Sequence, residues 1–232
     1  MSDNRYSKPV AFKRTTLAAA IALTFGTPAA FAGAPAANQL PGKGAVSSSS
    51  GAAKITSSPA KNGSGVTTET ITVGGGSGGN SSTGAGRGVI KWGNASSGLN
   101  SKQPAGFNIG SSAALHFVNK NTASPGAQSA VLNIDTSGNP SQIMGTLNDN
   151  TPTNKGVDIF VANGNGIIVG SSASISSKGA IGLIGESGSS LTYTLSAGNG
   201  PYDGIHFNGK SGGKVTVNKG ASITAGSTVL VA

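Results

Sequence analysis

The side chains that acid–base or metal chemistry requires are few and widely spaced in this chain of 232 residues. The two histidines, His116 and His206, each lie between apolar neighbours in a β-prone run, where strand alternation points both rings toward solvent. The acids beyond residue 32 are also dispersed: Glu69, Asp135, Asp149, Asp158, Glu186 and Asp203. A polysaccharide-cleaving enzyme would need clustered acids for Ca²⁺. We therefore predict a protein that is not an enzyme and that uses no cofactor, metal or small-molecule substrate.

The glycine-rich and basic segments do not indicate phosphate or nucleic-acid binding. The glycine-rich block at residues 74–84 lacks the strand–helix context that a phosphate-binding loop needs. The chain has no Cys, which excludes disulfides and thiolate metal sites. The formal net charge is +9, but beyond residue 14 the Lys and Arg residues are scattered singly, whereas nucleic-acid-binding proteins gather them on one face. We expect no nucleic-acid partner.

The composition favours short strands joined by tight turns. Gly accounts for 38 residues and charged residues for only 10%, a mixture that is also compatible with disorder. From residue 89 onward, however, short β-prone runs alternate with Gly, Ser and Asn turns, and no helical stripe is evident. The runs cover residues 89–92, 114–118, 130–134, 157–161, 167–169, 180–184, 191–195, 205–207, 214–217 and 228–231. The prediction is an all-β fold.

An internal repeat relates several of these runs. Val169-Gly-Ser-Ser-Ala-Ser-Ile175 aligns without a gap with Val217-Asn-Lys-Gly-Ala-Ser-Ile223 at an offset of 48. Ile109-Gly-Ser-Ser-Ala-Ala-Leu115 matches the first of these at an offset of 60. The repeat favours a β-solenoid in which each coil buries its apolar residues against the next, with these offsets spanning two or three coils. A β-sandwich remains the alternative.

Asparagines recur in the predicted turns, at Asn108, Asn119, Asn133, Asn163 and Asn165. In a solenoid, we expect such residues to stack on one another along the axis.

The first 32 residues have the pattern of a Sec signal peptide. Four basic residues precede an apolar run at residues 17–25, and Ala30 and Ala32 occupy the −3 and −1 positions of a predicted cleavage site. A transmembrane anchor is the alternative, but the run is too short for about 30 Å of hydrocarbon. We therefore expect a secreted protein.

The rest of the chain divides into a leader and a domain. Residues 33–64 are rich in Ala, Pro, Ser and Gly without periodicity, which indicates a flexible leader. The predicted β-helix domain covers residues 65–232, with residues 66–73 and the strand at residue 89 capping its first end. Residues 229–232 lie inside a repeat without a polar cap, so we expect a fragment, a truncated product or the first part of something longer.

Six elements between residues 89 and 185 occur in a recognisable order. They are Ile90-Lys-Trp92, Phe107-Asn-Ile-Gly110, Ala114-Leu-His-Phe-Val118, Ala130-Val-Leu-Asn133, Gly138-Asn-Pro-Ser-Gln-Ile-Met-Gly-Thr-Leu147 and Val157-Asp-Ile-Phe-Val-Ala-Asn-Gly-Asn-Gly-Ile167. Together they resemble the secretion domain of two-partner-secretion exoproteins, the family of filamentous haemagglutinin. One departure is Gly164, which replaces the proline of the family's NPNGI motif and loosens that turn.

The resemblance implies a right-handed parallel β-helix with an N-terminal cap and an extra-helical hairpin. It implies Sec export, recognition in the periplasm by the POTRA domains of an outer-membrane β-barrel transporter, and passage to the surface of a Gram-negative bacterium. A host-cell or bacterial surface is the further partner expected of an adhesin. The alternatives are a polysaccharide-active β-helix enzyme and the delivery module of a contact-dependent toxin.

The residues that the resemblance singles out are turn residues: Asn139, Pro140, Asn163, Asn165, Gly166 and Ile167. One hypothesis is that these turns support recognition by the transporter. The other is that they are Asn-stabilised turns required for coil geometry. Both can hold, because misfolded turns would also block secretion.

Overall fold

A computed structural model describes the chain at residues 33–50, 55–61, 67–74, 86–120, 128–152, 155–186, 192–193, 205–206, 212–227 and 229–231. The predicted signal peptide, with Ala30 and Ala32, falls outside the described residues. The described residues contain strands and turns but no helix, which confirms the all-β prediction. It follows that none of them forms a helix able to cross a membrane.

The strands are short, from two to seven residues long. In chain order they are β1 (Gly44–Ser50), β2 (Ile55–Lys61), β3 (Thr67–Val73), β4 (Arg87–Trp92), β5 (Ala113–Asn119), β6 (Ser129–Asp135), β7 (Ser141–Ile143), β8 (Thr146–Asp149), β9 (Val157–Ala162), β10 (Ile167–Val169), β11 (Ser174–Ser177), β12 (Ile181–Ile184), β13 (Thr192–Tyr193), β14 (Ile205–His206), β15 (Val215–Val217), β16 (Ser222–Ala225) and β17 (Val229–Val231).

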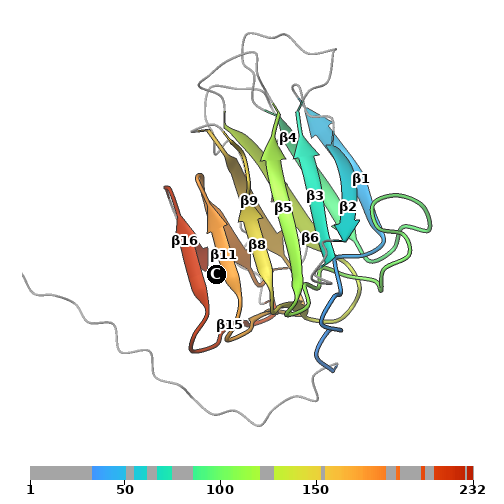
Figure 1. The fold of residues 1–232 in the computed structure, drawn as a ribbon, viewed down its shortest axis with the longest axis vertical. Coiled ribbons are helices and arrows are strands. Elements are labelled where there is room, and N and C mark those ends of the chain that lie inside the picture. Colours follow the sequence, from blue (N-terminus) through green and yellow to red (C-terminus); the bar gives the residue numbers. More distant parts are fainter. Residues whose placement is uncertain are drawn as a thin grey trace, which may run out of the picture. The chain divides into compact units, whose positions relative to one another are not determined.

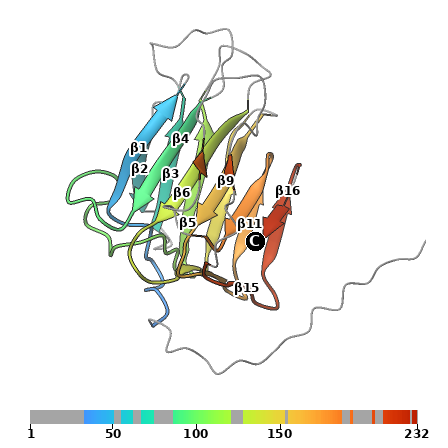
Figure 2. The ribbon, with the colours of Figure 1, turned by 180° about the vertical axis from the view of Figure 1, so that it is seen from behind.

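Most strands belong to three sheets, which the chain visits in a constant order from β5 onward (Figures 1 and 2). Sheet 1 has the strand order β1-β4-β6-β9-β12-β17, sheet 2 the order β16-β11-β8-β5-β3-β2, and sheet 3 the order β15-β10-β7. We use the word rung for one passage through sheets 3, 2 and 1, such as β7-β8-β9, β10-β11-β12 or β15-β16-β17. All pairs between rungs are parallel.

The pairing register confirms the columns of the repeat but not the expected number of coils. Val169 pairs with Val217 and Ile175 with Ile223, so the offset of 48 is one rung. The offset of 60 is two rungs, because Ile109 bridges Ile143, which pairs with Val169. The estimate of two or three coils is wrong for the first offset, because the chain leaves the sheets between β12 and β15 and forms the antiparallel pair β13–β14 there.

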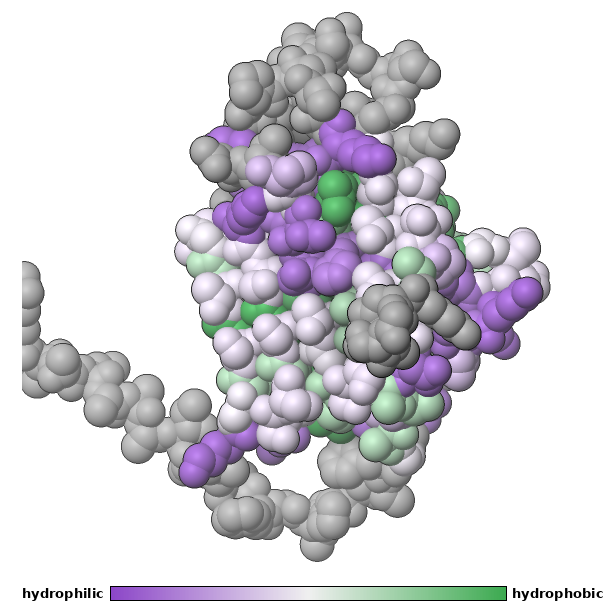
Figure 3. All heavy atoms as spheres, in the orientation of Figure 1, coloured by the Kyte–Doolittle hydropathy of each residue, from purple (hydrophilic) through white to green (hydrophobic). Residues whose placement is uncertain are grey.

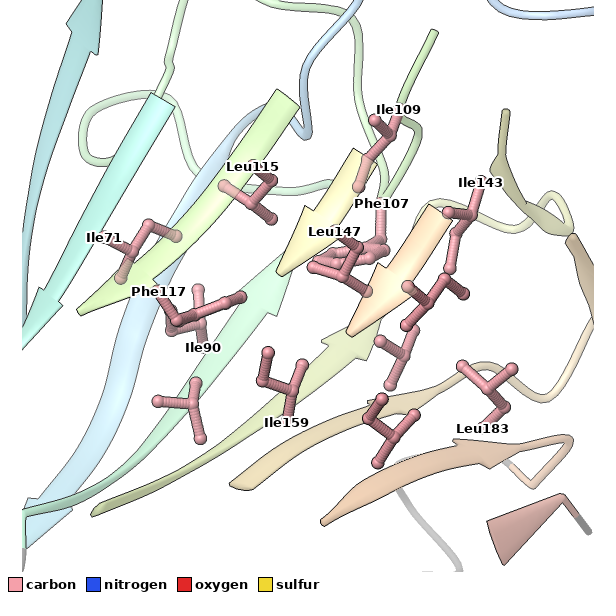
Figure 4. Packing of buried hydrophobic residues seen from close by; sticks show 14 of the residues in the cluster. Ile71, Ile90, Phe107, Ile109, Leu115, Phe117, Ile143, Leu147, Ile159 and Leu183 are labelled. Carbon is pink, nitrogen blue, oxygen red and sulfur yellow. The ribbon is translucent and has the colours of Figure 1, made fainter. Parts of the chain in front are cut away.

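Inward-facing apolar side chains from all three sheets form one core. In β3, burial alternates along the strand, as expected for a strand with one face on a core and one toward solvent. Figure 4 shows residues such as Ile71, Leu115, Leu147 and Ile159 converging between the sheets. Each fully buried aliphatic side chain contributes about 1.5–3 kcal/mol. The outer face of sheet 2, which faces the viewer in Figure 3, is largely hydrophilic to neutral.

Sheet 1 is apolar on both faces. A second cluster lies on its outer face and consists of Val89, Leu132, Ile134, Ala162 and Ile184, with Phe160 packed against them. Strands of sheet 1 therefore carry near-continuous apolar runs, as is typical of parallel strands that are covered on both sides.

The first end of the sheets is closed by β1 and β2, which run antiparallel to β4 and β3. The prediction of a flexible leader over residues 33–64 is wrong for these two strands. They were missed because they consist largely of Ser, Ala and Gly and are held by backbone pairing, which leaves no apolar periodicity. The strand expected at residues 66–73 is β3. It pairs in parallel with β5 inside sheet 2, so the strand that caps this sheet is β2 and not β3.

Two close contacts tie this cap to the core. Gly44 of β1 lies against the Trp92 ring, and a Cβ at this position would come within 2.5 Å of the ring. The Trp92 ring is itself buried and packs edge-on against Phe107 with ring centroids 5.9 Å apart. The absence of a side chain at residue 44 thus lets β1 approach sheet 1 over its largest aromatic residue.

A buried carboxyl group joins four segments of the cap. Ser57 Oγ and Asn100 Nδ2 both donate hydrogen bonds to the carboxylate of Glu69 in β3, and Asn100 Nδ2 also donates to the Pro41 carbonyl at 2.9 Å. Glu69 is fully buried, and this burial raises the pKa of its carboxyl from 4.5 to about 7, although the two hydrogen bonds act in the opposite direction.

The raised pKa of Glu69 makes the fold less stable at neutral pH than at acidic pH. The folded state favours the protonated form of the Glu69 carboxyl. The stability that this preference contributes is therefore fully present below about pH 4.5 and is lost as the pH rises through about 7. We expect the free energy of unfolding to fall by about 3 kcal/mol over that range. Urea titrations from pH 5 to 8 should show a smaller decline in Glu69→Gln, with Glu186→Gln as the carboxyl-to-amide control. Equal declines in wild type and Glu69→Gln would contradict the assignment.

Candidate functional site: two stacked turns

The six turn residues predicted from the sequence lie at one corner of two neighbouring rungs. One turn joins β6 to β7 and contains Asn139 and Pro140, and the other joins β9 to β10 and contains Asn163, Asn165 and Gly166. Ile134 pairs with Ala162 before the turns and Ser141 with Ile167 after them. The structure therefore brings five of the six residues into one stacked pair of turns, and the sixth, Ile167, begins β10 directly after them.

Asn163 connects the two turns. Its side-chain Nδ2 donates to the Asn139 carbonyl at 2.8 Å and to Ser141 Oγ at 2.9 Å. The Ser141 amide in turn donates to the Gly166 carbonyl at 3.0 Å. Since Asn163 and Ser141 are fully buried, these bonds satisfy polar groups that have no access to water.

The two turns use the same local hydrogen bond. The Asn165 amide donates to Asn163 Oδ1 at 2.8 Å, and the Ser137 amide donates to Asp135 Oδ1 at 2.9 Å. Both are bonds from residue i+2 to the side chain of residue i, the pattern of an Asx turn. Asp135 and Asn163 thus serve as equivalent residues on successive rungs: Asp135 is the last residue of β6, and Asn163 directly follows β9.

Asp135 and Ser141 are members of the site that sequence reasoning missed. Asp135 Oδ2 accepts hydrogen bonds from Ser141 Oγ at 2.7 Å and from the Phe107 amide at 2.8 Å. These bonds hold the end of β6 to the start of β7 and to residue 107. The position of Asp135 in the sequence could have identified it. Asp135 directly follows an apolar run and lies two residues before a polar turn residue, as Asn163 does relative to Asn165.

Burial separates the residues that hold the turns from those that a partner can touch. Asn163, Gly166 and Ile167 are buried, whereas Asn139 and Asn165 are exposed and Pro140 is half-buried. Gly166 has a φ of 104°, and a Cβ there would lie 2.7 Å from the Lys214 carbonyl of the following rung. The surface of the site therefore consists of amide side chains beside a proline, which suits hydrogen-bonded recognition.

The expected stack of asparagines along the axis is wrong. Asn133 accepts a hydrogen bond from Trp92 Nε1 at 3.1 Å and donates to the Phe160 carbonyl at 3.0 Å, and its neighbours in register are Ile90 and Val161. Asn108 Oδ1 accepts from the Gln142 amide at 2.9 Å. These asparagines occupy different register positions, so they do not coincide and instead bond to the backbone of the neighbouring rung.

The remaining titratable candidates are dispersed. His116 is half-buried on the outer face of sheet 2 and contacts Asn148 Oδ1, while the side chain of His206 lies outside the described residues. Asp158 is fully buried, and burial is the main cause of its raised pKa, with Asp149 adding to the rise and Arg87 opposing it. Within the described part of the chain, no three His, Asp or Glu residues lie close enough to share a metal ion.

Comparison of the chain with protein-family models, curated proteins and solved structures gave no match. The chemistry of the stacked turns therefore rests on their own residues: buried groups that hold the backbone and exposed amides that a partner can contact.

Truncating Asn163 should destabilise the fold far more than truncating its neighbour Asn165. Asn163→Ala leaves the buried Ser141 hydroxyl and the Asn139 carbonyl without their shared donor. We expect a loss of about 2–3 kcal/mol in the free energy of unfolding, measured by urea titration. The exposed Asn165→Ala should change it by no more than about 0.5 kcal/mol. Similar losses in both variants would rule out a special role for Asn163.

Proposed function

We propose that this chain is the secretion module of a two-partner-secretion exoprotein, folded as a right-handed parallel β-helix and exported through an outer-membrane β-barrel transporter with POTRA domains. The observation that carries the proposal is the position of the two segments most similar to the family's motifs, residues 138–147 and 157–167. The first leads into the rung β7-β8-β9 and the second leads out of it, so their turns lie at one corner, where Asn163 bonds to Asn139 and Ser141.

The strand order supports the β-helix. Sheets 3, 2 and 1 are visited in the same order in each complete rung, and backbone bonds join each rung to the next in parallel register. A β-sandwich would pair its strands mainly antiparallel within two facing layers. Antiparallel pairs in the three sheets occur, within the described residues, at β1–β4 and β2–β3, as expected of a cap.

A stepwise folding mechanism fits this architecture. The mature chain crosses the periplasm extended, and its main chain pairs with the transporter by strand addition, which needs little side-chain specificity. Outside the cell, the capped first rung offers free backbone groups on which the next rung forms. Each added rung buries apolar residues such as Leu147 and Ile175, and this free energy opposes backward movement. The module itself acts as an interaction protein at the cell surface.

Within this mechanism, Asn139 and Asn165 are the side chains that a transporter reads, in the extended chain before the corner forms. Asn139 and Asn165 are exposed, and the Asn165 side chain makes only a long hydrogen bond of 3.4 Å to Asn163 Oδ1, whereas the buried Asn163 holds the corner together. We therefore assign recognition by the transporter to Asn139 and Asn165, and support of the coil geometry to Asn163.

Export assays can separate recognition from folding. In a Gram-negative host carrying a POTRA-type transporter that secretes the wild-type chain, deletion of residues 89–185 should leave the product in the periplasm. The double variant Asn139→Ser, Asn165→Ser should reduce secretion at least several-fold while its unfolding midpoint stays unchanged. Asn218→Ser, an exposed Asn on the last rung, is the matched control.

Quantitative immunoblots of periplasm and medium provide the readout. Normal secretion of the deletion variant would refute the proposed function. Normal secretion of the double Ser variant would show that the turns act through folding alone.

A further inference from the structure

A hollow opens at the capped end of the fold, between the edge strand β2 and the segment that follows β4. Figures 1 and 2 show this segment looping out beside the cap strands. The hollow has a volume of about 680 Å³, which is within the range of about 300–1,000 Å³ that is typical of small-ligand sites. We call it the cap groove, and its lining residues are Thr56, Ser57, Pro59 and residues 98–103. None of them belongs to the stacked turns.

Hydrogen bonds hold both walls of the cap groove in place. On the β2 side, Ser57 Oγ donates to the buried carboxyl of Glu69. On the other side, Asn100 Nδ2 donates to the same carboxyl. Leu99 and Gly44 exchange two backbone hydrogen bonds of 2.9 Å, which tie this wall to β1. The groove is therefore formed before a ligand arrives, and this lowers the conformational cost of binding.

Several polar side chains of the cap groove take no part in this framework. Within the part of the chain that the structure describes, no hydrogen bond or ion pair involves the side chains of Thr56, Ser101, Lys102 or Gln103. The first three are exposed, and Gln103 is half-buried. Together they offer two hydroxyls, one ammonium and one amide, a set that can bond to several hydroxyl and carboxylate oxygens of one ligand.

Charge and shape narrow the class of ligand. Among the described residues that line the groove, Lys102 is the only one with a charged side chain, so the groove favours an anion. None of these lining residues is aromatic or an arginine, the side chains on which nucleobases stack. Pro59 has no N–H to offer to a peptide strand at the edge of β2. Pro59 and Leu99 instead provide apolar contact for the C–H face of a sugar ring.

We propose that the cap groove binds an acidic saccharide, a chain of sugar rings that carry carboxylates. The Lys102 ammonium pairs with a carboxylate, and the Ser101 hydroxyl and the Gln103 amide bond to ring hydroxyls. The ring itself lies against Pro59 and Leu99. This binding does not rest on the proposed secretion function, because it engages the folded cap, whereas the transporter meets the extended chain. Such a saccharide can come from an animal or a bacterial surface, and both sources carry the same recognition chemistry.

Titration calorimetry of the purified chain with uronate oligosaccharides tests the groove. The probes are a hexamannuronate of bacterial type and a hyaluronan hexasaccharide of animal type, and neutral maltohexaose is the control. We expect saturable binding of at least one uronate with a Kd of about 1 mM or tighter, and the tighter probe identifies the source. Lys102→Gln should weaken this binding about five- to tenfold. Lys91→Gln removes an exposed charge of β4 outside the groove and should leave the affinity unchanged.

Amide chemical shifts give a second measurement, which locates the bound saccharide on the wild-type chain. The uronate should shift the amide signals of residues 99–103, while those of Asn139 and Asn165 stay in place. Because the Lys102 side chain is exposed, Lys102→Gln should keep the wild-type unfolding midpoint. Absence of saturable binding at about 10 mM uronate would overturn the proposal. So would equal weakening in Lys91→Gln, maltohexaose binding as tight as that of the uronates, or shifts confined to residues outside the groove.

Discussion

The structure depends on backbone hydrogen bonds that run from each rung to its neighbours. In a helix or a hairpin, a segment satisfies most of its own backbone, but here a strand such as β10 can do so only when β7 and β15 lie on either side of it. Every rung therefore requires a layer above and a layer below. This requirement explains why the chain closes its first end with antiparallel strands, and why Val217 and Val229 in the last described rung are more exposed than Val169 and Ile181 in the rung before it.

The polar residues of the core follow from the same constraint. Where the chain turns between sheets 1 and 3, it cannot pair as a strand, and the groups left over are buried. Asp135 and Asn163 resolve this by bonding to the turn that follows and to the rung beside it. An apolar residue at either position would pack equally well but would leave amides and carbonyls unsatisfied, at a cost of about 1–3 kcal/mol each. Side chains in these turns therefore have two tasks, holding the corner and presenting exposed amides beside it.

The features that could be predicted from the sequence are those whose apolar residues recur at a fixed spacing. The columns Val169–Val217 and Ile175–Ile223 were found because their apolar residues are separated by turns of equal length. Ile143 and Leu147 belong to the same columns but were not found, since the turn between them is two residues shorter than the turn between Val169 and Ile175. The pairing of Asp135 with Ser141 and the cap strands β1 and β2 escaped for another reason. They depend on polar and backbone contacts, which leave no periodic apolar signal in one sequence.

Unequal turns also explain how one set of sheets can carry variable surface segments. Ile143 and Val169 are paired across one rung, as are Val169 and Val217, yet the second rung takes nearly twice the length of chain. The added residues leave the sheets after β12 and return before β15 without changing the register on either side. Because closing a flexible loop of double length costs only about 0.6 kcal/mol more, the rung interface tolerates such additions. Segments that differ in length and composition can therefore be placed at the corners, while the parallel sheets that position them stay the same.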